Sequence, residues 1–427
     1  MRWLPSAAAV ATAAASGVYL SSPSDPKSPQ MKLLPRSERA DNSEALTALR
    51  RRCLTSLTIR REEAAAPGMS LCVSLGGRRL MSGGVGFADV ENLIPCNERS
   101  VLRVASISKC FTAVLAAQMM EAGQMDFDKP VGEYLTKPEM KKFSRMTVRQ
   151  LLSHTAGVRS YHRTDSDELE NPEYYITKYY ASATEATKEL LCNDKEAIAS
   201  EPPGSQFLYS THGYTLLGAV LERLSGDQPI DSLLKKLFVQ MGLSSGTVPE
   251  QHAPIIRNRA RQYQRSKNSP STLNNAAYID NSYKYSGGGV LSCAEDLVAF
   301  GELMMRCANG EDCNGILKPN TIKMLWSAVP GTKVNWGVAF TGPYCLGFGT
   351  ANYRGEQIVL HTGASIGGTS ILLMVPRIGA VIAVICNLQR VSLTGLAVSI
   401  LDAVFDYVQE TAACAEPSTE VSACARF

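Results

Sequence analysis

The stretch "RVASISKCFTAV" places a serine, Ser106, three positions before a lysine, Lys109. On a helix, residues three apart have Cβ atoms about 5–6 Å from one another, so the lysine amine can reach the serine hydroxyl. An amine that accepts the hydroxyl proton would make Ser106 a nucleophile, and backbone N–H groups at a helix start would stabilise the resulting oxyanion. That chemistry requires a lysine pKa lowered from about 10.4 to near neutrality, which costs roughly 4 kcal/mol and needs a buried, charge-crowded site.

The surroundings of this pair separate it from other pairs with the same spacing. The chain contains two more, Ser24 with Lys27 and Ser232 with Lys235. The first lies between prolines in a linker, and the second begins an amphipathic surface helix on which a solvated lysine is expected. The residues after Ser106 are instead apolar or small on nearly every side up to Glu121, and a helix that is apolar all round is buried. Burying Lys109 without a purpose would be costly, so we expect this pair to be functional.

Two further segments carry groups with related chemistry. Tyr209 precedes a helix with a stripe of leucines and a valine, and His361 ends an apolar strand in "VLHTGASIGG". Taken alone, a tyrosine before a buried helix is more often a packing residue, and a strand-end histidine followed by Thr-Gly is a weak signal. The order of the three segments along the chain is what makes them informative together.

Ser-x-x-Lys at the start of a helix, Tyr-x-Ser/Asn before a second helix and a basic residue with Thr-Gly on a strand follow that order in penicillin-recognising serine enzymes. From about residue 67 to residue 388, this sequence resembles that superfamily of serine beta-lactamases and penicillin-binding proteins, in its class C-like form. The segments "GVGFADVEN", "MTVRQLLSHTAGV" and "DNSYKYSGGG" are similar to the connecting segments of the family. Within this superfamily, the sequence most resembles an animal mitochondrial branch of beta-lactamase-like proteins, in the segments "APGMSLCVSL", "VASISK" and "FLYSTHGYTLL".

The resemblance implies a role for each of these residues. Ser106 is expected to be the acylated nucleophile, with Lys109 as its proton acceptor and Tyr209 as a group that relays the proton and later helps water to attack. His361 stands where many relatives have lysine, so a positive charge there would depend on pH. The backbone N–H groups of Ser106 and Ala364 would hold the oxyanion, one such donor being worth roughly 3–4 kcal/mol in barrier. The other expected substrate-binding residues are Thr362, Gly363 and Thr211.

One departure from the family pattern bears on the substrate. Thr211 stands where relatives have an asparagine whose amide contacts the acylamino side chain of a beta-lactam, so hydrolysis of beta-lactams is not expected. No acidic residue matches the deacylating glutamate of one lactamase class, which leaves deacylation to Tyr209 and Lys109. The resemblance therefore favours a serine peptidase that acts on peptide or small amide bonds and is linked to lipid metabolism. Two alternatives stay open, a filament-forming scaffold without turnover and an esterase acting on small esters.

Both ends of the chain supply strands. "MSLCVSL" and "RRLMSGGVGFAD" predict two strands around a glycine turn, and "QIVLH", "TSILLMVP" and "AVIAVICN" predict three more far along the chain. We therefore expect an α+β fold of the beta-lactamase/transpeptidase-like kind, with an antiparallel sheet flanked by helices and a mainly helical insertion. The sheet subdomain is expected at about 43–100 and 285–410, the helical subdomain at about 101–284 and a tail at 411–427. The first helix is expected over 43–61 and the last over 393–408.

Composition excludes several classes of protein. Hydrophobic residues make up 45% and charged residues 19% of the chain, the balance of a soluble globular protein, and a net charge of +3 gives no argument for nucleic-acid binding.

The basic run "IIRNRARQYQRSK" alternates like a half-exposed strand, and a solvated face explains it better than an anionic partner or a lipid surface. Cysteines without a C-x-x-C pair and histidines without metal-ligand spacing predict no metal and no cofactor. The even cysteine count leaves disulfides open at Cys307–Cys313 and Cys414–Cys424.

Residues 1–42 have the composition of a targeting segment followed by a Pro/Ser-rich linker, with no acidic residue before Asp25. Two interpretations fit, an organelle transit peptide and a secretory signal whose apolar core ends near Ala13–Ala15. The resemblance favours the mitochondrion, including its intermembrane space, over secretion. It also implies a homo-oligomer or filament, with association at a membrane surface as a further expectation.

Overall fold

The computed structural model describes residues 43–160, 176–243, 246–266, 269, 271–311 and 313–413. The targeting segment 1–42 and the Cys414–Cys424 pair therefore lie outside the described residues. Cys307 and Cys313 are both buried free thiols, so the structure has no disulfide at that pair.

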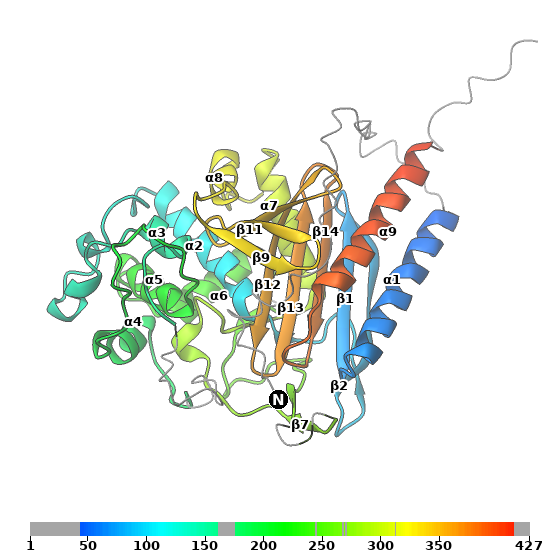
Figure 1. Ribbon diagram of the computed structural model, residues 1–427, viewed down its shortest axis with the longest axis horizontal. Helices are drawn as coiled ribbons and strands as arrows, with labels where there is room; N and C mark the ends of the chain where they lie inside the picture. The colour runs from blue at the N-terminus through cyan, green and yellow to red at the C-terminus, as the bar shows by residue number, and fades with distance from the viewer. Residues whose placement is uncertain are drawn as a thin grey trace, which may run out of the picture.

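A seven-stranded antiparallel sheet joins the two ends of the described chain (Figure 1). Its strand order is β11-β12-β13-β14-β1-β2-β3, and β1 pairs with both β2 and β14, with Val73 opposite Ile382. The strands are β1 (Gly68–Leu75), β2 (Arg78–Asp89), β3 (Ile94–Pro95), β11 (Gly349–Tyr353), β12 (Glu356–Ser365), β13 (Gly368–Val375) and β14 (Ala380–Cys386). The expected fold class, α+β with a sheet built from both chain ends, is confirmed.

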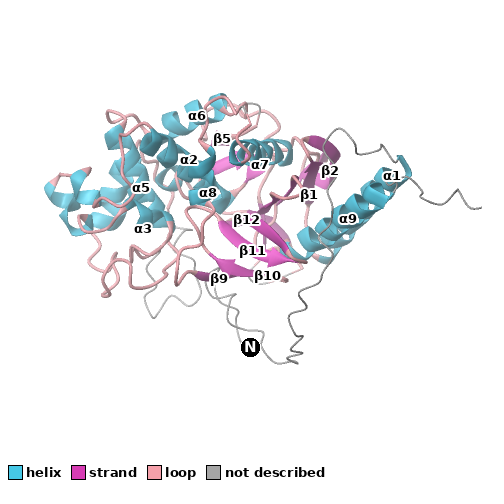
Figure 2. Ribbon diagram, turned by 90° about the horizontal axis from the view of Figure 1, so that it is seen from above, coloured by secondary structure: helices cyan, strands magenta, loops and turns pink. Residues whose placement is uncertain are grey.

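Helices cover both faces of this sheet (Figures 1 and 2). Against one face lie α1 (Ser43–Glu63) and α9 (Thr394–Ala413), side by side, and against the other lies α7 (Ala294–Ala308). Side chains alternate between the two resulting cores, so Val73 packs in the core that includes α1 and α9, and Cys72 in the core that includes α7. Because both faces are covered, β1, β13 and β14 are buried along their whole length and read as continuous apolar runs. The last helix continues past the predicted end near residue 408.

A mainly helical region lies beside the sheet (Figure 2). Its helices are α2 (Ser108–Glu121), α3 (Val148–Leu152), α4 (Ala183–Thr187), α5 (Thr211–Leu224) and α6 (Ile230–Gln240), and α8 (Pro319–Leu325) follows α7 along the chain. The buried carboxylate of Glu222, on α5, accepts backbone N–H bonds from Ala183, Thr184 and Ile230 at 2.7–2.9 Å. Those N–H groups lie at the starts of α4 and α6 and have no partner within their own helices, so Glu222 holds both helices against α5.

Shorter strands form smaller sheets of two or three strands outside the seven-stranded one. They are β4 (Leu102–Arg103), β5 (Val248–Pro249), β6 (Tyr263–Arg265), β7 (Leu273–Asn275), β8 (Val290–Ser292), β9 (Lys333–Gly337) and β10 (Phe340–Pro343). The basic run therefore forms a strand over three residues only. Arg259 pairs with buried Glu250 at 2.9 Å and Arg261 with Asp89 at 3.0 Å. Arg261 is an exposed side chain, in line with the predicted solvated face, whereas Arg259 is partly buried against Glu250 and departs from it.

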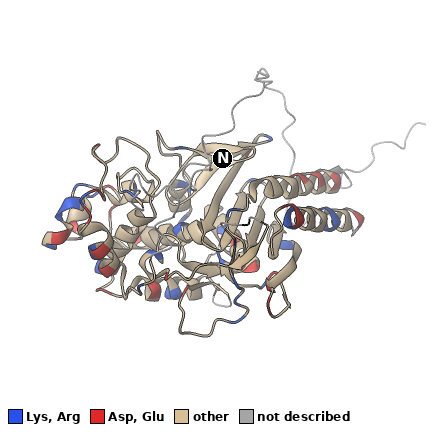
Figure 3. Cartoon of the chain, turned by 60° about the horizontal axis from the view of Figure 1, so that its bottom comes forward, with Lys and Arg blue, Asp and Glu red and all other residues tan. Residues whose placement is uncertain are grey.

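Charges of both signs are mixed over the helical region and along α1 in the view of Figure 3, whereas α9 carries acidic residues only. This mixture fits the small net charge of +3. Over the part of the chain that the structure describes, none of the helices combines the length and apolar character needed to cross a membrane.

Candidate active site

The turn that carries Ser106 is fixed by close contact with β12. Ala105 has φ +48°, a left-handed conformation that costs a residue with a Cβ on the order of 1–2 kcal/mol. Gly363 of β12 lies so near the turn that a Cβ on it would stand 2.2 Å from the carbonyl oxygen of Val104. Ser370 Oγ donates to the same carbonyl at 2.8 Å. Only glycine at position 363 allows β12 to come this close to the strained turn that carries Ser106.

The second serine of the motif, Ser108, has a structural task. It is fully buried, donates through Oγ to the carbonyl of Ala105 at 2.6 Å and accepts from the N–H of Val290 at 3.1 Å. α2 begins at this residue, after a 3₁₀ turn over Ala105–Ile107. Ser106 therefore stands in a short turn just ahead of the α-helix, whereas the sequence predicted it at the helix start.

Lys109 is wholly buried within reach of Ser106. Its Nζ lies 3.1 Å from Ser106 Oγ and donates to the carbonyl of Gly287 at 2.5 Å. The same nitrogen lies 4.8 Å from the ring centre of Tyr209 and 5.4 Å from that of Tyr214. Burial lowers the pKa of Lys109 to about 7, because a buried ammonium loses its hydration. About half of the molecules therefore carry a neutral amine near pH 7, and a neutral amine can accept a proton from Ser106.

Tyr209 completes the group around Ser106. It is half-buried just before α5, and its hydroxyl lies near enough to Ser106 to interact with it electrostatically. Burial raises the pKa of Tyr209, and this effect outweighs the opposite effect of Ser106, so the pKa lies above its ordinary value. The phenol is therefore protonated at pH 7, and it is Lys109 that is available as a base.

Thr211 lies beside this group at the start of α5. Ser210 caps the helix by accepting the N–H of Gly213 at 2.8 Å, and the N–H of Thr211 donates to Ser160 Oγ at 2.6 Å. A Cβ built on Gly287 would lie 3.1 Å from the Thr211 methyl group. Thr211 thus packs against the same glycine whose carbonyl binds Lys109.

His361 occupies the interior of β12, not its end. It is 1% exposed, its Nδ1 lies 2.6 Å from the carbonyl oxygen of Thr362, and its Nε2 lies 3.0 Å from the hydroxyl of Tyr344. A carbonyl can only accept, so Nδ1 carries the proton and Nε2 accepts from Tyr344. Burial, with the nearby Lys109, lowers the pKa of His361 to about 3. The prediction of a pH-dependent positive charge near neutrality is therefore wrong, because burial keeps this imidazole neutral.

The remaining predicted residues follow on the same strand. Thr362 and Ala364 alternate with buried His361 and Gly363, so they occupy the more open side of β12. Ala364 is paired in register with Thr369 of β13. The structure thus brings β12, the Ser106 turn and Tyr209 together from three distant segments.

Sequence reasoning missed two partners in this group, Gly287 and Tyr344. Gly287 acts through its backbone carbonyl, and the run of three glycines in "YSGGGV" was its only signal. Tyr344 is fully buried and lies in "GPYCLGFG", where nothing distinguishes it from a core aromatic residue.

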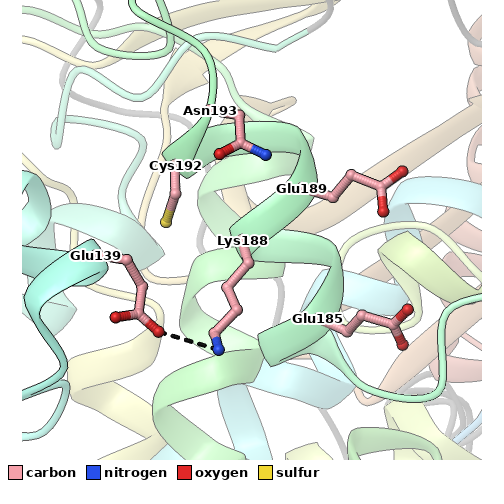
Figure 4. Close-up of a pocket in the computed structure, with 6 residues that line it drawn as sticks. All are labelled: Glu139, Glu185, Lys188, Glu189, Cys192 and Asn193. Carbon is pink, nitrogen blue, oxygen red and sulfur yellow. Dashed lines mark ion pairs between the residues drawn. The ribbon is translucent and has the colours of Figure 1, made fainter.

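A surface hollow of about 360 Å³ lies elsewhere on the helical region (Figure 4). Its lining consists of Glu139, Glu185, Lys188, Glu189, Cys192 and Asn193. The charged groups there pair with one another or with neighbours, as Lys188 does with Glu139 at 3.0 Å. Burial raises the pKa of the Cys192 thiol, which makes it a poorer nucleophile. None of the predicted catalytic residues lines this hollow, so its chemistry does not compete with that of Ser106. Among the described residues there is also no group of three or more His, Cys, Asp or Glu side chains that could hold a metal ion.

Comparison with known proteins assigns the chain to one family. The family described as Beta-lactamase matches residues 55–405, most of the chain. The chain belongs to the Beta-lactamase family. The human protein named "Serine beta-lactamase-like protein LACTB, mitochondrial" is 33% identical over 425 residues, which cover 80% of this chain and 77% of that protein. The predicted membership of the beta-lactamase and penicillin-binding protein superfamily is confirmed.

Solved structures of other proteins share the Beta-lactamase family fold. An octameric penicillin-binding protein homologue from Pyrococcus abyssi superposes with a TM-score of 0.69 at 22% identity, covering 83% of this chain and 77% of that one. D-amino acid amidase from Ochrobactrum anthropi SV3 superposes with a TM-score of 0.68 at 20% identity, covering 86% of this chain and 99% of that one. The chain therefore has the serine hydrolase fold of this superfamily.

Proposed function

We propose that this Beta-lactamase family protein is a serine hydrolase that forms an acyl-enzyme on Ser106 with Lys109 as the general base. The observation that carries the proposal is the fully buried Lys109 amine, 3.1 Å from Ser106 Oγ and with a pKa lowered to about 7. A base with a pKa near the working pH is the one best suited to accept the hydroxyl proton.

The proposed reaction uses three side chains in sequence. Neutral Lys109 takes the proton of Ser106 as Oγ attacks the substrate carbonyl. Tyr209, a protonated phenol beside Ser106, passes a proton to the leaving group and takes a proton back from Lys109. Water then attacks the acyl-enzyme with Lys109 again as the base, and Ser106 is released.

The proposed oxyanion site consists of the backbone N–H groups of Ser106 and Ala364. What supports it is the close approach of Gly363, the residue before Ala364 on β12, to the Val104 carbonyl in the turn that leads into Ser106. Thr362 and Thr211 are proposed to contact the substrate. Neutral His361 is proposed to act by holding Tyr344 and β12 in place, because its two ring nitrogens are both engaged within the protein.

The proposed substrate is a peptide or a small amide, as in a serine peptidase. Thr211 lacks the amide that would contact a beta-lactam side chain, and the likeness in fold to a D-amino acid amidase supports an amide substrate. A small-ester esterase would use the same residues. A scaffold without turnover would gain nothing from burying Lys109, whose desolvation destabilises the fold.

The human relative is named as mitochondrial, and we extend that location to this protein, with residues 1–42 as its transit peptide. A link to lipid metabolism, an oligomer or filament, the intermembrane space and contact with a membrane surface belong to the same proposal. The octameric homologue supports the oligomer. Imaging of the full-length chain beside one lacking residues 1–42 tests the location, because loss of mitochondrial signal is expected only for the shortened chain.

The proposed nucleophile is tested by intact-mass analysis after incubation with a fluorophosphonate. We expect a single phosphonyl adduct on the wild type and none on Ser106→Ala. The matched control is Ser232→Ala, because Ser232 has the same spacing to Lys235 but Lys235 is exposed and paired with Asp231. That variant should label at the wild-type rate. An adduct that survives in Ser106→Ala, or a wild type that never labels, would refute the assignment.

A further inference from the structure

His154 lies in "LLSHTAG", part of one of the connecting segments that resemble those of the family. The side chain is 2% exposed, and the residue has φ +60°, a left-handed conformation that is uncommon outside glycine. Such strain persists only where the surrounding structure holds it, and it gathers at functional sites. The residue therefore merits a physical explanation.

The backbone and ring of His154 bind the two residues that flank Tyr209. The N–H of Leu208 donates to the His154 carbonyl at 2.8 Å, and the N–H of Ser210 donates to its Nδ1 at 3.1 Å. The ring itself lies against the Tyr209 ring, with centres 4.2 Å apart and planes inclined by 39°. One residue thus contacts the tyrosine segment before, at and after Tyr209.

The bond from Ser210 fixes the protonation state of His154. A ring nitrogen that accepts an N–H bond carries no proton, so the neutral ring has its proton on Nε2. Burial and the neighbouring Lys109 and His361 lower the pKa of His154 well below its usual value, which keeps the acceptor available at pH 7.

The segment that carries His154 is itself firmly anchored. α3 begins with a capping box between Thr147 and Gln150. At its other end the carbonyl of Leu152 accepts from the Tyr214 hydroxyl at 2.9 Å and from the N–H of Gly347 at 3.2 Å. His154 is therefore a rigid support for the tyrosine segment.

We propose that His154 is a positioning residue. It holds the Tyr209 phenol beside Ser106 by accepting hydrogen bonds from the N–H groups of Leu208 and Ser210. The inference rests on the proposed function, since it gives Tyr209 a catalytic task. His154 touches no reacting atom in this scheme. Its left-handed backbone turns the ring back onto the tyrosine, which is why the strain is retained.

Two substitutions separate the acceptor from the backbone conformation. His154→Gly tolerates φ +60° but removes Nδ1 and the ring, whereas His154→Asn tolerates it nearly as well and offers Oδ1 in place of Nδ1. The quantities to measure for each variant are the saturating rate of fluorophosphonate labelling and the fluorophosphonate concentration that gives half of that rate. His154→Gly should lower the saturating rate roughly 10- to 100-fold with little change in half-saturation. His154→Asn should recover most of that rate, and His252→Asn, an exposed histidine, should match the wild type.

A double-mutant cycle with Tyr209→Phe tests whether His154 acts through the phenol. Once the hydroxyl is gone, adding His154→Gly should slow labelling by less than threefold. A full and independent loss in the double variant, or an asparagine variant as slow as the glycine one, would overturn the inference. If instead the wild type itself fails to label, the proposed function fails, and the two failures are distinguished.

Nitrogen NMR of histidine-labelled wild type gives a test that needs no variant to fold. The expected result is a neutral His154 with its proton on Nε2, in contrast to His361 with its proton on Nδ1. A proton on Nδ1 of His154 at pH 7 would leave Ser210 without its acceptor and would overturn the inference.

Discussion

Replacing Lys109 by methionine tests the energetic cost of the site. Burial lowers the pKa of this lysine from its ordinary 10.5 to about 7, which at pH 7 corresponds to roughly 4 kcal/mol of lost stability. Methionine has a similar length and no charge, so the variant escapes that cost. It leaves the Gly287 carbonyl without its donor, which costs about 1–3 kcal/mol. We therefore expect Lys109→Met to unfold with a free energy about 1–3 kcal/mol higher than the wild type at pH 7.

The sign of the pH dependence follows from the same pKa difference. The folded-state pKa of Lys109 lies below the unfolded-state value, so the unfolded chain binds more protons between pH 7 and pH 10.5. The destabilisation is complete below pH 7 and declines as the pH rises toward 10.5. The advantage of Lys109→Met should therefore shrink by about 3 kcal/mol between pH 7 and pH 9.5.

The assay is urea unfolding of wild type, Lys109→Met and Lys235→Met at both pH values. Lys235 is an exposed lysine paired with Asp231 at 3.1 Å, so its variant should stay within about 0.5 kcal/mol of the wild type. A Lys109→Met variant that is less stable than the wild type at pH 7, or whose advantage is the same at pH 9.5, would refute the reasoning.

Two further substitutions probe the support around the site. Gly363→Ala places a Cβ 2.2 Å from the Val104 carbonyl oxygen. We expect this variant to lose at least about 2 kcal/mol in unfolding free energy and to label more slowly. Gly395→Ala, whose Cβ would meet no atom within 4 Å, should change neither the unfolding free energy nor the labelling rate. Tyr344→Phe removes the hydrogen-bond donor to buried His361 Nε2 and should lower the unfolding free energy by about 1–3 kcal/mol. The loss should be the same at pH 6 and pH 9, because the pKa of His361 is about 3. A loss that differs between the two pH values would show that His361 titrates in that range.

The sequence was sufficient to pair Ser106 with Lys109, because local spacing sets their distance and the apolar helix that follows predicts burial. The sheet strands were equally predictable, since continuous apolar runs such as "AVIAVICN" indicate strands that are covered on both faces. In both cases the information lies within a few residues of the feature itself.

The state of His361 and the partners of Lys109 could not be predicted in this way. The charge of His361 depends on Tyr344 and on burial by distant elements, and the local sequence "VLHTGASIGG" indicates neither of them. The acceptor for Lys109 is a backbone carbonyl 178 positions away, at Gly287, and every residue type supplies a carbonyl. The contacts of His154 with Leu208 and Ser210 depend likewise on tertiary structure.

The pH dependence of Ser106 acylation tests the central claim most directly. Only neutral Lys109 can accept the hydroxyl proton, so the fluorophosphonate labelling rate should rise with pH around a midpoint near 7, the pKa of the buried amine. Between pH 5 and pH 9 the rate should increase roughly 100-fold before it levels off. A flat profile, or a rate that still climbs toward a midpoint near 10, would contradict Lys109 as the base.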